Sequence, residues 1–76
     1  MNNTRRKILD ELVERLEEVK ARLEEVRQDE EESYDNLPEA FQEGSRGERM
    51  QEAISRMEDA FGSMEEAIDG LTEARE

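Results

Sequence analysis

Two runs of apolar residues, placed symmetrically about residue 40, constrain the fold of this 76-residue chain more than any other feature. Both runs advance by alternating steps of three and four residues, the spacing of a helix face that packs against another helix. The first run is Leu9, Leu12, Leu16, Val19, Leu23 and Val26, and the second is Met50, Ile54, Met57, Phe61, Met64, Ile68 and Leu71. Folding the chain back at residue 40 pairs the runs in register, for example Val19 with Phe61 and Val26 with Ile54. We therefore predict an all-α fold, an antiparallel two-helix hairpin that packs like a coiled coil.

Local signals predict where the helices begin and end. Asn3 or Thr4 can cap the first helix, and Pro38 disfavours a helical conformation at the residue before it. Ser45 and Glu48 have the spacing of a capping box, which opens a second helix. For the single domain over residues 1–76, these signals predict a helix over about 4–33, a turn over about 34–45 with a helical turn over 38–42, and a helix over about 46–74.

Alanine recurs every seven residues beside the second apolar run, and a column of such small side chains lets another helix approach closely. The column consists of Ala53, Ala60, Ala67 and Ala74. Because two helices cannot cover both sides of so wide an apolar stripe, we expect two hairpins to dimerise into a four-helix bundle. The alanine column is the candidate contact between the two copies. A monomer with a solvent-exposed apolar run is the alternative.

The charge balance bears on which partners the chain can bind. Aspartate and glutamate number 23 against 11 lysines and arginines, which gives a formal net charge of -12 at pH 7. Such a surface repels the phosphates of DNA and RNA, so we expect no direct nucleic-acid binding. The sequence contains no run of about 18 apolar residues, so we expect no membrane span. The first residues also lack the apolar segment of a secretion signal, which favours the cytoplasm as the location.

The chain lacks the side chains on which most enzymes rely. It contains no cysteine and no histidine, which removes the thiol nucleophile, the usual general base and thiolate metal sites. The acidic run over residues 29–32 has the charge to attract a divalent cation loosely, but it lacks the spaced ligands and the central glycine of a calcium loop. We therefore expect no enzymatic activity, no catalytic residue, no metal site and no cofactor, and we interpret the run as a solvated helix end.

Two groups of apolar residues serve either the fold or a partner. Tyr34, Leu37 and Phe41 gather in the predicted turn, where they either close the end of the bundle or form a partner-binding surface, since aromatic residues anchor many interfaces. The methionines of the second apolar run belong either to the helix core or to an adaptable partner groove. The sequence leaves both questions open.

The turn and its flanks carry the most specific motif of the chain. The motif reads Tyr34-Asp35-Asn36-Leu37-Pro38-Glu39, then Gln42, then Ser45-Arg46-Gly47-Glu48-Arg49-Met50, followed by Ala53-Ile54 and Met57-Glu58. This pattern is similar to that of small acidic helical-hairpin proteins of bacteria and their phages. The resemblance implies a small cytoplasmic protein of bacterial or phage origin, and it carries over no functional residue. Phe41 departs from the pattern.

Two functions fit these observations. In the first, the chain is a non-enzymatic interaction module that self-associates and binds a protein partner. In the second, its carboxylates imitate the phosphates of duplex DNA, and the chain occupies the nucleic-acid site of a host protein as an inhibitor encoded by a phage. The candidate residues of this acidic mimic face are Glu14, Glu17, Glu18, Glu24 and Glu25. An acidic surface is also an ordinary means of staying in solution, so charge alone does not decide between the two.

Overall fold

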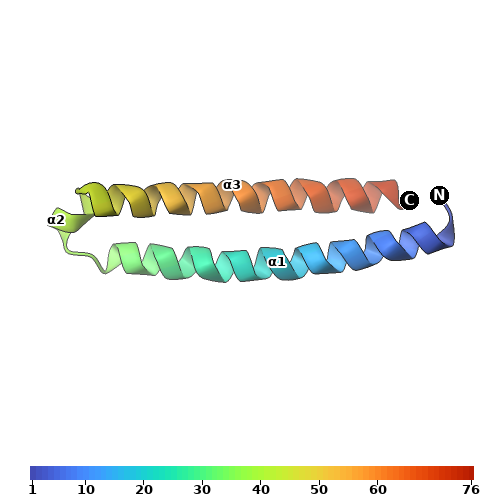
Figure 1. The fold of residues 1–76 in the computed structure, drawn as a ribbon, viewed down its shortest axis with the longest axis horizontal. Helices are drawn as coiled ribbons and strands as arrows, with labels where there is room; N and C mark the ends of the chain where they lie inside the picture. The colour runs from blue at the N-terminus through green and yellow to red at the C-terminus, as the bar shows by residue number, and fades with distance from the viewer.

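Two long antiparallel helices lie side by side, and a segment that contains a short helix connects them (Figure 1). We call this connecting segment, residues 36–44, the corner. The computed structural model describes all 76 residues. The helices are α1 (Asn3–Asp35), α2 (Glu39–Gln42) and α3 (Ser45–Ala74). Both termini lie at the end of the hairpin that is remote from α2 (Figure 1). The predicted helical hairpin is confirmed, and the helix ends lie within a few residues of the expected positions.

The caps of the two long helices differ from those expected. Asn2 caps α1, because its side-chain Oδ1 accepts a hydrogen bond from the backbone N–H of Arg5 at 2.8 Å. The N-cap of α3 is Gly44, whose backbone is extended (φ −86°, ψ −175°), and no side chain caps this end. The predicted capping box of Ser45 and Glu48 is therefore wrong. Ser45 is already the first helical residue, so its hydroxyl is not at the position from which a cap accepts backbone N–H groups.

α3 packs against α1 through the apolar run predicted for it. Ile68 is buried, and every other member of that run, from Met50 to Leu71, is half-buried. The run keeps its alternating steps of three and four residues along the whole helix, so one continuous stripe of α3 faces α1. The α3 half of the predicted contact is confirmed.

α1 faces α3 with a different set of residues from the one predicted. Every second member of the first apolar run, starting from Leu9, is half-buried. The alternate members are exposed, Leu12 by 40%, Val19 by 52% and Val26 by 55%. The residue that follows each of them is half-buried instead, namely Val13, Lys20 and Arg27. The predicted pairing of Val19 with Phe61 is therefore wrong, as is that of Val26 with Ile54.

Two long basic side chains account for this rotation of α1. Lys20 places its Nζ 5.2 Å from the centre of the Phe61 ring and 3.6 Å from a carboxylate oxygen of Glu17. Arg27 pairs with Glu24, at 2.7 Å between Nη2 and Oε1, and also with Glu31. Such side chains cover apolar surface with their stems while the charged heads stay in water. A pattern of apolar residues does not count these stems, which is why the sequence favoured Val19 over Lys20.

The open end of the hairpin is held by contacts between the two termini. Arg6 Nε donates a hydrogen bond of 2.8 Å to the backbone carbonyl of Arg75, just past the end of α3. Arg75 in turn forms an ion pair with Asp10 of α1. The carbonyl groups at a helix C-terminus lack helical donors, so a cation from the neighbouring helix is well placed there.

The hairpin is a rod with almost no interior. Its Cα atoms extend over 58 × 15 × 12 Å, with a radius of gyration of 17.2 Å. A compact domain of 76 residues would have a radius of gyration of about 11 Å. Ile68 is the single buried apolar side chain. Most of the apolar surface of this chain is therefore only half covered by the hairpin itself.

Candidate functional site

Polar side chains hold the corner between α1 and α3. The side-chain amide of Gln42 donates hydrogen bonds to the backbone carbonyls of Tyr34 at 3.0 Å and of Leu37 at 3.1 Å. The Tyr34 carbonyl, in the last turn of α1, also accepts a hydrogen bond from the backbone N–H of Leu37 at 3.1 Å, so Gln42 adds a second donor there and supplies one to the Leu37 carbonyl beyond the helix. The hydroxyl of Tyr34 accepts a hydrogen bond of 2.7 Å from Gln51 Nε2, which ties the end of α1 to α3. These contacts fix the direction in which the chain returns.

Gly47 allows α3 to pass directly against α2. It is one of two buried residues, and a Cβ added to it would lie 2.0 Å from the carbonyl oxygen of Gln42. No residue of the chain has a positive φ, so the glycine is required for space and not for its backbone angles. Tyr34, Gln42 and Gly47 all belong to the specific motif of the sequence. That motif therefore builds the corner, a role that residue patterns alone did not indicate.

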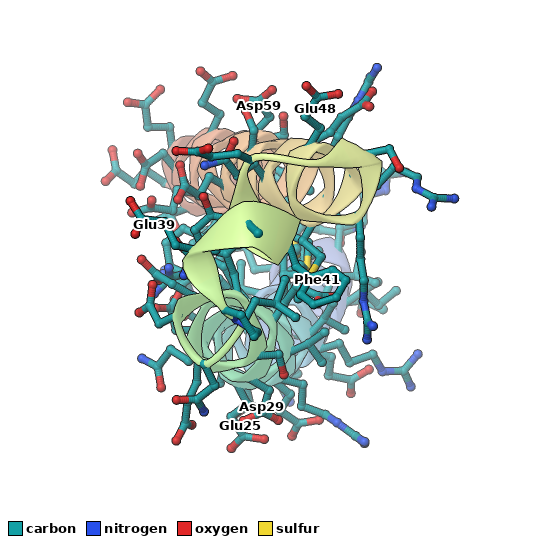
Figure 2. The ribbon with its side chains drawn as sticks, turned by 90° about the vertical axis from the view of Figure 1, so that its left-hand side faces the viewer. Glu25, Asp29, Glu39, Phe41, Glu48 and Asp59 are labelled. Carbon is teal, nitrogen blue, oxygen red and sulfur yellow. The ribbon has the colours of Figure 1, made fainter.

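The predicted partner surface of Tyr34, Leu37 and Phe41 is not one continuous patch. Tyr34 is half-buried and bonded within the corner, and Leu37 is half-buried as well. Phe41 is 56% exposed. Seen from the corner end, Phe41 lies to the right of α2, and Glu39 points to the left (Figure 2). Of the three predicted residues, only Phe41 offers a largely exposed side chain.

The exposed apolar residues of both long helices lie on one face of the hairpin. On α1 they directly precede residues that face α3, as Val19 precedes Lys20, and on α3 the alanines directly precede residues that face α1, as Ala60 precedes Phe61. In both helices the exposed apolar residues come one position before the residues that contact the other helix, so they are rotated about the helix axis in the same sense. Because the two helices are antiparallel, this rotation places both sets on the same side of the hairpin. We call this surface the apolar face: Ile8, Leu12, Val19 and Val26 of α1, and Ala53, Ala60, Ala67 and Ala74 of α3.

The structure places the predicted alanine column on this face and adds a second half to it. Ala60, Ala67 and Ala74 are exposed, and Ala53 is half-buried. The α1 half was missed from the sequence because its members were assigned to the core of the hairpin. The available signal was the repeat of long basic residues one position after them, at Lys20 and Arg27.

Carboxylates gather on the opposite side of the hairpin. We call this side the acidic face. Each of its residues directly follows a residue that contacts the other helix, and they are Asp10, Glu14, Glu17, Glu24 and Glu31 of α1, and Glu58, Glu65 and Asp69 of α3. In Figure 2, oxygen-tipped side chains crowd the left, where Glu39 points, and nitrogen-tipped side chains gather on the right, where Phe41 lies. With right-handed helices, the apolar face is on the right in this view. The two faces therefore differ in charge as well as in polarity.

The carboxylates predicted to imitate phosphates are not equivalent. Glu14, Glu17, Glu18 and Glu25 are exposed, whereas Glu24 is half-buried. Hydrogen bonds from Arg27 hold the pKa of the Glu24 carboxyl below its ordinary value, and the same bonds raise the pKa of Arg27. Glu17 and Glu24 lie on the acidic face, but Glu25 points outward from the back of α1 (Figure 2). The predicted set thus spans two sides of one helix.

No other arrangement of side chains suggests a binding centre. A shallow hollow on the acidic side is lined by seven residues, Glu31, Tyr34, Asp35, Gln51, Ile54, Ser55 and Glu58. No three acidic side chains come close enough together to hold a metal ion. No helix is long and apolar enough to cross a membrane. Comparison of the chain with protein-family models, curated proteins and solved structures finds no match.

Proposed function

We propose that this chain is a non-enzymatic, acidic protein–protein interaction module of a bacterial or phage cytoplasm, and that it works as a homodimer with the form of a four-helix bundle. The apolar face is the observation that carries the proposal. It exposes aliphatic side chains of α1 by 40–55% along one side of the rod. Large exposed apolar surfaces that are bordered by polar residues often mark interaction sites.

Dimerisation through the apolar face leaves two other surfaces free for a partner protein. The acidic faces point away from the contact on both sides of the bundle. The corner carries Phe41, whose exposed aromatic ring has the character of an interface anchor. A partner with a basic or an aromatic-binding surface fits these features.

The mass of the protein in solution tests the proposal. The chain has a mass of 8.9 kDa, and we expect sedimentation equilibrium to give twice this value at micromolar concentrations. The apolar contact is the reason, so the mass is expected to stay dimeric when salt is added. A protein that remains monomeric at high micromolar concentration would contradict the homodimer.

A DNA-mimicking inhibitor is the second candidate function, and one observation favours it. The carboxylates of the acidic face lie opposite the apolar face, so a dimer presents two acidic surfaces to its surroundings. Association driven by such charge falls steeply as salt screens it, with a screening length of about 10 Å at 0.1 M. Binding through an aromatic anchor is far less sensitive to salt.

Charge removal separates the two candidates. We expect an inhibitor that imitates DNA to lose affinity for its target in steps when Glu14, Glu17, Glu18, Glu24 and Glu25 are changed to glutamine. An interaction module that works through the corner would keep its partner in this variant. It would instead lose about 2 kcal/mol or more of binding free energy in Phe41→Ala. Calorimetric titration against a partner captured from the host, at low and high salt, provides the measurement.

A further inference from the structure

The hairpin has a larger solvent-accessible area than a compact monomer of the same mass. The accessible area is 5827 Å² for 8.9 kDa. A compact monomer of the same mass exposes about 4,800 Å². The excess of about 1,000 Å² is comparable with the roughly 800 Å² that each partner contributes to a stable interface. The apolar face runs along a rod 58 Å long, and we expect a second copy on it to cover an area of this size.

The two halves of the apolar face differ in side-chain size. The α1 half carries branched aliphatic side chains such as Val19, and the α3 half carries only alanine; Leu12, Val19 and Val26 have the same seven-residue repeat as the alanines. If α1 of one copy packs on α3 of the other, every contact joins a large residue to a small one. If α1 packs on α1, large side chains meet large ones and alanines meet alanines, which forces unequal helix spacings. Interiors pack best where large and small residues alternate across the contact.

Charges along the borders of the apolar face distinguish the same two arrangements. The α1 border carries Arg15, Arg22 and Asp29, at intervals of seven residues. The α3 border carries Arg49, Arg56, Ser63 and Gly70, with the same interval. All seven residues are exposed, and Arg15, Arg22 and Arg49 form no ion pair within the chain.

Packing α1 on α3 of a second copy, with both corners at one end, matches these borders. Asp29 lies near the corner end of α1, toward the back of the helix beside Glu25 (Figure 2), at the outer edge of the apolar face and level with Arg49 and Arg56 of the second copy. Farther from the corner, Arg22 lies between Arg56 and Ser63 of the second copy, and Arg15 lies between the uncharged Ser63 and Gly70. Packing α1 on α1 with the corners at opposite ends would instead set the arginines of one α1 border against those of the other. Like charges placed opposite each other oppose association.

We infer that the apolar face binds a second copy of this chain with α1 of each hairpin against α3 of the other, and with both corners at the same end. The inference rests on the proposed homodimer and specifies its geometry. Each helix then has two antiparallel neighbours, one from its own chain and one from the second copy. The two exposed Phe41 side chains lie at the same end of the bundle, which gives the dimer one aromatic end.

The distance between the two corners tests the geometry. Ala40 is exposed in α2, and the chain has no cysteine, so Ala40→Cys can be spin-labelled at one site per copy. We expect dipolar spectroscopy to give an inter-copy distance well below half of the 58 Å length of the rod. A distance close to the full length would overturn the same-end arrangement while leaving the homodimer intact. Absence of any inter-copy distance, together with a monomeric mass, would overturn both.

A charge exchange gives a second, independent readout. Asp29→Arg is expected to weaken the dimer several-fold, because it faces Arg49 and Arg56 of the second copy. Adding Arg49→Glu and Arg56→Glu to the same chain is expected to restore most of the affinity. Within one hairpin the two borders lie on the outer sides of different helices, so recovery requires contact between copies. Failure of the triple variant to recover dimer affinity would contradict the arrangement.

Discussion

Gly47→Ala is expected to destabilise the protein by about 1–3 kcal/mol, the usual cost of forcing a side chain into filled space. The added Cβ would lie 2.0 Å from the oxygen and 2.5 Å from the carbon of the Gln42 carbonyl, and both belong to the backbone. Neither atom can rotate away, so α2 has to move. That movement also pulls the Gln42 amide away from the end of α1. For a domain of this size the expected fall in melting temperature is about 4–8 °C per kcal/mol.

The same substitution elsewhere in α3 provides the control. A Cβ at Gly62 or at Gly70 meets no atom within 4 Å. Alanine favours the helix over glycine by up to about 1 kcal/mol, so Gly62→Ala and Gly70→Ala are expected to raise the melting temperature. Thermal unfolding followed by circular dichroism compares the three variants directly. Equal behaviour of Gly47→Ala and Gly62→Ala would refute the close contact between α2 and α3.

The double variant Ala60→Glu and Ala67→Glu is expected to separate the dimer and, with it, to remove most of the cooperative unfolding. A long charged side chain does not fit a close helix contact, and burying an unpaired charge costs several kcal/mol. The dissociation constant is expected to rise on the order of a thousandfold, which corresponds to roughly 4 kcal/mol. Ile68 is the one buried apolar side chain of the hairpin, so a separated chain keeps little to stabilise it. Light scattering and thermal unfolding at two protein concentrations measure both effects.

Adding the same charge on the other side of α3 isolates the role of the apolar face. Ser55 and Thr72 are exposed, and both lie away from the alanine column. Ser55→Glu with Thr72→Glu is expected to leave the dimer intact, although the net charge changes equally. Wild-type protein is expected to melt at a higher temperature as its concentration rises, as for any folded state stabilised by association. A melting temperature independent of concentration would argue that the hairpin is stable alone.

The hairpin could be predicted from the sequence because its two apolar runs match in period and lie symmetrically about residue 40. The run of α3 carries its whole contact in apolar residues, and the structure confirms it. The apolar residues of α1 form a stripe along the helix, and their periodicity does not indicate which side of that stripe faces α3. Lys20 and Arg27 decide the matter through aliphatic stems and charge pairs, which no count of apolar residues includes. For the same reason Val19 and Val26 were assigned to the hairpin contact, and half of the apolar face was overlooked.

The corner was the least predictable part, because its residues act through the backbone. The role of Gln42 depends on carbonyls that become available only where α1 ends. The need for glycine at Gly47 depends on how closely α2 approaches. Both depend on the three-dimensional course of the backbone, and neither produces a repeating pattern of residues in the sequence. The sequence nevertheless singled out this stretch as the most specific motif of the chain.

The position of both termini at one end of the rod has a practical consequence for protein engineering. A segment that enters and leaves at neighbouring points can be inserted into a surface loop without separating the two sides of that loop. The inserted hairpin would project as a stalk 58 Å long and carry the corner at its tip. Attachment of the free protein to a surface through either terminus would orient the corner outward in the same way. The hairpin therefore has the geometry of a spacer whose length is set by its helices and whose tip can be varied independently.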